Sequence, residues 1–217
     1  MLYIVATPIG NLKDITLRAL EVLKAVDLIA CEDTRHSRIL LQSYSINTPT
    51  TSYYQQNRFA KAKYLLRRLR EGANIALISD AGMPGVLDPG YHLINLAIQH
   101  DIPITAIPGP TALIMALVLS GKPTHRFIFE GFLPNKSSAR RRRLEELKEL
   151  NYTLIFYESC HRINATLGDI QDIFGDIPIA VSRELTKKFE EVLRLKVSQI
   201  REHLAKARPR GEFVVAL

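Results

Sequence analysis

The sequence lacks the features of secreted and membrane-spanning chains. No apolar run reaches the roughly 18 to 20 residues that are needed to cross a bilayer. The N-terminus carries neither a basic lead nor a long apolar core, so we expect a first strand over residues 2–6 and no signal peptide. The two cysteines, Cys31 and Cys160, lie far apart and form no paired motif. This usage favours a reducing compartment, and we expect a cytoplasmic protein without a membrane partner.

Several catalytic motifs are also missing. The first loop holds a single glycine, Gly10, where a dinucleotide fingerprint needs three, and Gly121-Lys122 is followed by Pro123, which rules out a phosphate loop. The six histidines show no zinc spacing, and no Gly-x-Ser-x-Gly elbow occurs. These absences argue against nicotinamide redox, nucleotide hydrolysis, zinc chemistry and triad acyl transfer, and we expect no metal site. A site of loop backbone, small residues and carboxylates remains, which suits a neutral or cationic small molecule.

Strand and helix patterns alternate through residues 1–121, which we interpret as an N-terminal α/β domain. This alternation predicts a mostly parallel sheet with helices on both faces. Small or charged residues follow each predicted strand, and parallel strands would bring these loops to one edge of the sheet. The loops span residues 7–11, 32–35, 79–85 and 108–112.

Residues 122–217 read as a second α/β domain, beginning after Gly121. Several predicted strands follow one another here without the regular alternation, so we expect a mixed sheet. The fold class is therefore α/β, with two domains.

The stretch 76–90 organises the first domain. An apolar strand over residues 75–78 leads into a loop that is crowded with glycine and proline, and such loops let backbone approach a ligand closely. Asp80 stands at the mouth of the strand, where its carboxylate can accept from a hydroxyl or an amine. The alternative is a tight turn in which Asp80 caps the next helix.

Basic residues indicate a polyanionic partner. The formal charge is +7, and it is concentrated at Lys136 and at Arg140 to Arg143, where phosphate contacts are one explanation and a solvated basic face is the other. Tyr53, Tyr54 and Arg58 lie in a connection between elements and could stack on splayed bases, or the aromatic rings could pack on the sheet edge.

A resemblance to a known family rests on motifs that occur in the family's order over essentially the whole chain. The chain resembles the bacterial small-subunit ribosomal RNA cytidine 2′-O-ribose methyltransferase I family, of the tetrapyrrole methylase superfamily. The motifs are Thr7-Pro-Ile-Gly-Asn-Leu-Lys-Asp-Ile15, Cys31-Glu-Asp-Thr-Arg35, Ser79-Asp-Ala-Gly-Met-Pro84, Asp88-Pro-Gly90, Pro108-Gly-Pro-Thr111, Phe156-Tyr-Glu158, Arg183-Glu-Leu-Thr-Lys187 and Gly211-Glu-Phe213.

The resemblance implies two α/β domains with S-adenosylmethionine in the cleft between them, a homodimer, and ribosomal RNA of the small subunit as substrate. It implies donor contacts from the strand-end loops and from one second-domain tyrosine. These residues are Pro8, Gly10, Asp80, Gly82, Met83, Pro84, Gly109, Thr111, Ala112 and Tyr157. The expected RNA contacts are Arg35, Tyr53, Arg58, Lys136, Arg140, Arg141, Arg142 and Arg143.

The chain departs from the family pattern at several points. The common Ser-Tyr-His-Glu-His-Asn is Ser52-Tyr-Tyr-Gln-Gln-Asn57, which removes two imidazoles and a carboxylate. Met83 replaces a threonine of the donor loop, and Cys160 replaces a proline. The family also usually has a further C-terminal segment, which we expect this chain to lack.

A ribose hydroxyl is a poor nucleophile and gains from a general base. The candidates are Asp33, Glu130, Glu184 and Glu212, with Lys187 if it is desolvated. For Asp33 the alternative is a structural ion pair with Arg35. Two other functions stay open at this point: a tetrapyrrole methyltransferase of the same fold, and a non-catalytic RNA-binding or ribosome-assembly protein.

Overall fold

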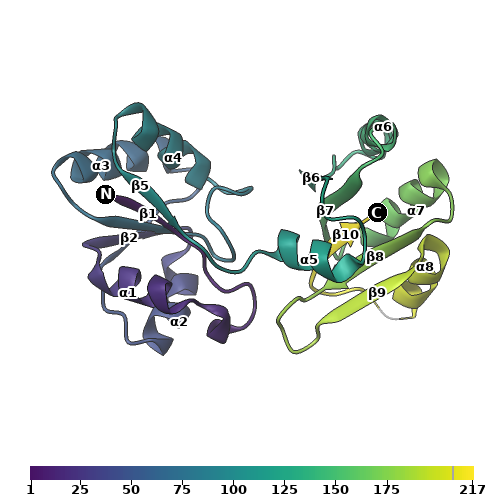
Figure 1. The fold of residues 1–217 in the computed structure, drawn as a ribbon, viewed down its shortest axis with the longest axis horizontal. Coiled ribbons are helices and arrows are strands. Elements are labelled where there is room, and N and C mark those ends of the chain that lie inside the picture. Colours follow the sequence, from purple (N-terminus) through teal and green to yellow (C-terminus); the bar gives the residue numbers. More distant parts are fainter. Residues whose placement is uncertain (207) are drawn as a thin grey trace. The chain divides into compact units, whose positions relative to one another are not determined.

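The computed structural model describes residues 1–206 and 208–217, which form two compact units (Figure 1). The first unit spans Met1–Thr111 and the second Ala112–Leu217. The expected boundary after Gly121 therefore moves to the start of helix α5 (Ala112–Ser120), because this helix packs on the sheet of the second unit. In the described part of the chain, no helix is long and apolar enough to cross a membrane.

A mostly parallel sheet was predicted for the first unit, and the sheet is parallel throughout, with the strand order β3-β2-β4-β1-β5. The neighbouring strands β2 and β4 are buried along their whole length, which is typical of parallel sheets covered on both faces. The shortest strand, β3, was not predicted, because Thr-Thr-Ser at the sheet edge is polar and only partly buried. The strands are β1 (Leu2–Val5), β2 (Leu28–Cys31), β3 (Thr50–Ser52), β4 (Ile75–Ile78) and β5 (Ile104–Ile107).

Helices cover both faces of this sheet, because successive strand residues point to opposite sides. Ile29 and Ile78 pack with α1 and α2, whereas Ala30 and Leu77 pack with α3 and α4. The first helix begins at Leu17, because Thr16 caps it by accepting a hydrogen bond from the Ala19 N–H at 3.1 Å. The helices are η1 (Leu12–Asp14), α1 (Leu17–Ala25), α2 (Thr34–Ser43), α3 (Arg58–Arg70) and α4 (Gly90–Gln99).

The second unit has the predicted mixed sheet, in the order β6-β7-β10-β8-β9. The pair β6 and β7 is parallel, and the other neighbours are antiparallel. The strands are β6 (Phe127–Phe132), β7 (Thr153–Ser159), β8 (Pro178–Arg183), β9 (Glu191–Lys196) and β10 (Glu212–Ala216).

Three helices cover one face of the second sheet, namely α6 (Ser137–Lys148), α7 (Ile163–Phe174) and α8 (Val197–Ala205). They pack on alternate strand residues, including Phe156, Val181 and Val215. Helix α5 contacts β7, β8 and β10 outside this core.

Candidate functional site

The loops predicted to share an edge do so in the first unit. Val5 pairs with Ile107, and Cys31 pairs with Ile78, so the parallel strands end side by side. The loop after β4 leads to α4 on one face of the sheet, whereas the loops after its neighbours β1 and β2 lead to α1 and α2 on the other. Open α/β sheets bind ligands where neighbouring connections diverge in this way.

Two of these loops are locked together at the divergence. The Thr7 N–H donates to the Gly82 carbonyl at 2.9 Å, and the Gly82 N–H donates back to the Thr7 carbonyl at 3.0 Å. The buried Thr7 hydroxyl also donates to the Ser79 carbonyl at 3.0 Å. Gly82 has φ of +81°, a left-handed conformation that glycine adopts without strain. The first and third predicted loops therefore form one rigid backbone surface.

The loop after β5 joins the same surface. A Cβ on Gly82 would lie 3.6 Å from Ile9 Cγ2 and 3.7 Å from the Pro110 carbonyl oxygen. At Gly109 a Cβ would lie 2.8 Å from the Ala6 Cβ, so only glycine allows this close approach to β1. The structure thus brings three of the four predicted loops into contact through glycines.

Asp80 does not cap the following helix, which excludes the turn-only interpretation of its role. Its Oδ1 instead accepts from the Asp33 N–H at 3.2 Å, which ties the loop after β4 to the loop after β2. Helix α4 begins at Gly90, and the carboxylate of Asp88 holds the backbone at this helix start through hydrogen bonds. Asp88 Oδ1 accepts from the N–H groups of Gly85 at 2.9 Å and Gly90 at 2.7 Å.

The carboxylates at this edge differ in the direction in which their surroundings shift the pKa. Hydrogen bonds from Arg35 lower the pKa of Asp33 to about 2, and the two side chains form an ion pair at 2.8 Å. Asp33 is therefore a weak base, and Arg35 is bound to it, as the structural alternative proposed. Burial, then the charges of Asp80 and Asp88, raise the pKa of Glu32. Glu32 and Asp88 were not among the functional residues predicted from the sequence, although Glu32 directly follows the buried strand β2.

The predicted donor-binding residues fall in both units. Pro8, Gly10, Asp80, Gly82, Met83, Pro84, Gly109 and Thr111 belong to loops of the first unit. Met83 packs partly against the α3 and α4 core. Ala112 and Tyr157 belong to the second unit, where burial raises the pKa of the Tyr157 phenol and the Leu113 N–H donates to it. No group of three metal-ligating side chains occurs among the described residues.

A second polar cluster lies at the end of β8. The Lys187 ammonium contacts Glu184 at 2.9 Å and Glu212 at 2.7 Å. Burial alone would lower the pKa of Lys187, but hydrogen bonds to both carboxylates outweigh it and raise the pKa. Lys187 is therefore a cation and not a desolvated base. Burial alone would raise the pKa of Glu184. The hydrogen bond and the charge of Lys187 act in the opposite direction, and the pKa of Glu184 is lowered.

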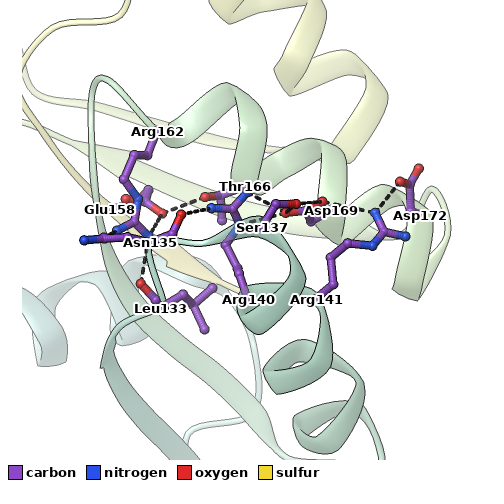
Figure 2. Close-up of polar contacts among 10 residues, drawn as sticks. All are labelled: Leu133, Asn135, Ser137, Arg140, Arg141, Glu158, Arg162, Thr166, Asp169 and Asp172. Carbon is purple, nitrogen blue, oxygen red and sulfur yellow. Dashed lines mark hydrogen bonds and ion pairs between the residues drawn. The ribbon is translucent and has the colours of Figure 1, made fainter.

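The arginine run of α6 is largely bound to carboxylates. Figure 2 shows Arg140 pointing toward Asp169, where its Nη2 lies 2.6 Å from Oδ2, and the Arg140 side chain is only 5% exposed. Arg141 contacts Asp169 at 3.0 Å and Asp172 at 2.6 Å. The prediction that Arg140 binds RNA is therefore wrong, because it is buried against α7.

The other two arginines of the run are also paired. Arg143 contacts Glu130 at 2.6 Å and Glu146 at 3.0 Å. Glu130 is thus engaged in an ion pair, which weighs against its role as a free base. Arg142 is 82% exposed and lies 3.2 Å from Glu146, and Lys136 is exposed at the start of the helix.

A buried network holds the loop before α6, as Figure 2 shows. Glu158 is buried and accepts from the Thr166 hydroxyl at 2.6 Å and from Arg162 at 3.1 Å. Arg162 in turn donates to the Leu133 carbonyl at 2.8 Å and to the Asn135 side chain. These contacts give Glu158 and Arg162 a structural role within the second unit, because they hold the loop before α6 in place.

Tyr53 is 1% exposed, and its hydroxyl donates to the Pro89 carbonyl at 3.2 Å. Burial raises its pKa to about 12. The prediction that Tyr53 stacks on RNA bases is wrong, and its ring packs in the α3 and α4 core instead. Its neighbour Tyr54 is exposed, and the Arg58 guanidinium lies 4.4 Å above the ring of Phe59.

Comparison with known proteins shows to which family this architecture belongs. The family model of the Tetrapyrrole (Corrin/Porphyrin) Methylases matches residues 1–201. The solved Uroporphyrin-III C-methyl transferase from Thermus thermophilus, complexed with S-adenyl homocysteine, aligns with a TM-score of 0.64 at 18% identity over 99% of this chain and 96% of that chain. The fold is therefore shared with methyltransferases of this class.

Curated relatives refine the assignment. A Mesorhizobium japonicum protein named Ribosomal RNA small subunit methyltransferase I is 50% identical over 100% of this chain and 74% of its own length. A protein of the same name from Thermotoga maritima is 46% identical over 100% of this chain and 97% of its own length. The chain therefore spans about three quarters of the first relative and nearly all of the second. The chain belongs to the tetrapyrrole methylase family and, within it, to the family of ribosomal RNA small subunit methyltransferase I.

Proposed function

We propose that the protein transfers a methyl group from S-adenosylmethionine to the ribose 2′-hydroxyl of a cytidine in small-subunit ribosomal RNA. The observation that carries this proposal is the locked surface of Thr7, Gly82 and Gly109 at the diverging strand ends of the first unit. Support also comes from relatives of 46–50% identity that are named after this activity, which weighs against a tetrapyrrole substrate and against a non-catalytic RNA-binding protein.

The residues at this surface suit the methyl donor. S-adenosylmethionine, when bound, supplies the methyl group on an activated sulfonium. Its sulfonium and ammonium charges are complementary to the carboxylates of Glu32 and Asp80, which lie at the same edge. The donor would be held by the backbone of the loops, with Pro8, Gly10, Asp80, Gly82, Met83, Pro84, Gly109 and Thr111 from the first unit and Ala112 and Tyr157 from the second.

The chain's own contribution to the reaction is chiefly alignment. Because the donor is already activated, holding the hydroxyl in line with the reacting carbon provides most of what the protein must supply. Glu184 stays a predicted catalytic residue, with Lys187 as the cation that keeps it ionised. Glu32 is a further candidate base, because its raised pKa brings its proton affinity closer to neutral pH.

The proposal includes a cytoplasmic homodimer that acts on the small ribosomal subunit. The dimer rests on the family resemblance, and large apolar side chains such as Ile114 and Val118 are exposed on α5. Sedimentation at micromolar concentration tests the dimer, and a monomer would contradict it.

A pair of glycine variants tests the donor site. Gly82→Val should weaken S-adenosylmethionine binding at least tenfold, which is about 1.4 kcal/mol, because the side chain occupies the loop surface. Gly72→Val is the matched control, since Gly72, at the end of α3, also has positive φ but a Cβ there would have nothing within 4 Å. Titration calorimetry measures both affinities. Equal affinity of a folded Gly82→Val variant would remove this loop from the site.

The activity itself is tested with purified small ribosomal subunits and S-adenosylmethionine labelled in its methyl group. The expected result is label on the 2′-oxygen of one cytidine. Donor binding without any transfer to RNA would contradict the proposed substrate. The absence of donor binding would contradict the proposal that the protein is a methyltransferase.

A further inference from the structure

From its charge and the exposed aromatic ring of Phe59, we infer that helix α3 is the surface on which the protein binds its RNA. This inference rests on the proposed function and adds the location of the RNA contact. It also replaces the expectation that the arginine run of α6 supplies the main phosphate contacts.

Helix α3 is cationic and almost uncompensated. It contains basic residues and no acidic ones over its whole length: Arg58, Lys61, Lys63, Arg67, Arg68 and Arg70. In the described part of the chain, its ion pairs are two long contacts with Glu71, at 3.8 and 3.9 Å.

The arginines of α6 differ in this respect. Each of them lies within 2.6–3.2 Å of a carboxylate oxygen. A guanidinium that already binds a carboxylate gains little from a phosphate, so the uncompensated helix offers the stronger attraction for a polyanion. The sequence alone suggested the opposite ranking, because it displays the arginines but not their partners.

The amphipathic pattern of α3 fixes where its charges point. Ala62, Leu65, Leu66 and Leu69 are buried against the sheet. Phe59, Lys63 and Arg67 follow at intervals of four on the exposed side, and Arg70 continues this row one turn later. We call Lys63, Arg67 and Arg70 the α3 cationic row.

Aromatic rings accompany these charges. The ring of Phe59 is 59% exposed, has the Arg58 guanidinium 4.4 Å from its centroid and meets the His92 ring edge-on at 5.0 Å. Further along the helix, the Lys61 ammonium lies 5.1 Å from the centroid of Tyr64. An exposed ring held by its neighbours beside cations is the arrangement on which unpaired bases stack.

The position of α3 connects this surface to the proposed donor site. In a parallel sheet, the helix after each strand begins at the carboxyl edge, so α3 after β3 and α4 after β4 both begin there. The contact between Phe59 and His92 joins these two helix starts. His92 lies two residues after Gly90, whose N–H binds Asp88 of the site loop. An RNA strand along α3 would therefore reach the edge where the methyl donor is proposed to bind.

RNA fits this surface better than a second copy of the chain. A symmetric dimer through α3 would bring two cationic rows together, which is unfavourable for like charges without acidic partners. A single-stranded RNA segment satisfies both features, because its phosphates meet the row and its bases meet the Phe59 ring.

The test compares two variants of equal charge. In the first, the α3 cationic row is neutralised by Lys63→Gln, Arg67→Gln and Arg70→Gln, which keeps helix propensity nearly unchanged. Its matched control has Arg18→Gln, Lys24→Gln and Arg38→Gln, which are exposed on α1 and α2 across the sheet.

Binding to small ribosomal subunits is measured for parent, row variant and control over a series of salt concentrations. The row variant should bind at least tenfold more weakly at about 0.1 M salt, and its slope of log affinity against log salt should shrink by about 2 to 3 units. The control should follow the parent. Phe59→Leu should weaken binding roughly tenfold with little change in slope, because stacking releases few counterions.

Calorimetry with S-adenosylmethionine and sedimentation of the same variants separate the possible failures. Equal loss in the row variant and the control would mean a diffuse charge effect and would overturn the role of α3. Parent-like subunit binding by the row variant, with methylation intact, would also overturn it while leaving the proposed function standing. A row variant that changes oligomeric state would identify α3 as an interface between copies instead. A parent that binds donor but methylates no RNA would refute the proposed function, whatever the row variant does.

Discussion

Removing the carboxylate of Asp169 should destabilise the second unit strongly. This side chain is 10% exposed and lies between Arg140 and Arg141, at 2.6 and 3.0 Å. In Asp169→Ala the guanidinium of Arg140, which is 5% exposed, stays buried without its countercharge. Breaking a buried ion pair from one side costs about 3–5 kcal/mol, because desolvation of the remaining charge is no longer offset.

A second carboxylate on the same helix provides the control. Asp172 also contacts Arg141, at 2.6 Å, but its side chain is 61% exposed. Asp172→Ala should cost less than about 1 kcal/mol, because water replaces the lost partner of an exposed pair. The two variants therefore remove the same chemical group from one helix and differ in burial.

Urea unfolding followed by circular dichroism measures the difference. With a slope of about 1.5–2 kcal/mol per molar urea, the transition of the second unit should move by roughly 2 M in Asp169→Ala and by less than about 0.5 M in Asp172→Ala. The double variant Arg140→Met, Asp169→Leu should recover most of the loss, since an apolar pair of similar size leaves no buried charge. Equal, small shifts for both single variants would refute the claim that α6 is anchored through this pair.

Two further predictions concern the cluster at the end of β8. Lys187→Arg should retain methylation with an unchanged pH profile. Lys187→Met should be less stable than the parent, and the difference should be largest between pH 4.5 and pH 10.5, the unfolded-state pKa values of Glu184 and Lys187. The contribution of Glu184 to stability is lost as the pH falls through its lowered pKa, and the contribution of Lys187 is lost as the pH rises through its raised pKa. Rate measurements test the Lys187→Arg variant, and loss of its activity would instead indicate proton transfer by the lysine. Gly211→Ala should lower the free energy of unfolding by about 1–3 kcal/mol more than Gly175→Ala, because a Cβ on Gly211 would lie 2.5 Å from the Glu184 side chain whereas Gly175 has nothing within 4 Å. Equal thermal shifts would contradict this close packing.

Much of the fold could be predicted because its signals are local. Short branched apolar runs marked the buried strands, and glycine-rich or charged loops marked their ends. Because the predicted strands run parallel, these loops had to share an edge, and the parallel register of Val5 with Ile107 confirms this. The prediction failed at β3, whose polar residues carry no burial signal, and at the domain boundary, because an apolar helix such as α5 does not reveal which sheet it covers.

The donor-site loops and the RNA surface differ in how far the sequence could specify them. Thr7, Gly82 and Gly109 could be found as loop residues, since small residues after buried strands are visible in the sequence. The partners of the charged and aromatic residues were not visible. The sequence suggested both Tyr53 and Arg140 as RNA contacts, and both are buried.

Apart from β3, the sequence by itself determined the order of strands and helices, the parallel character of the first sheet, the mixed character of the second and the set of loops at the carboxyl edge. These properties follow from periodicity and chain topology. Only the tertiary structure decided which cations are free, because an ion pair depends on residues that are distant in sequence. Arg140 meets Asp169 across 29 positions, whereas the cations of α3 meet no comparable carboxylate in the described part of the chain. A charge's availability to RNA is a property of its surroundings in space, and the sequence does not display them.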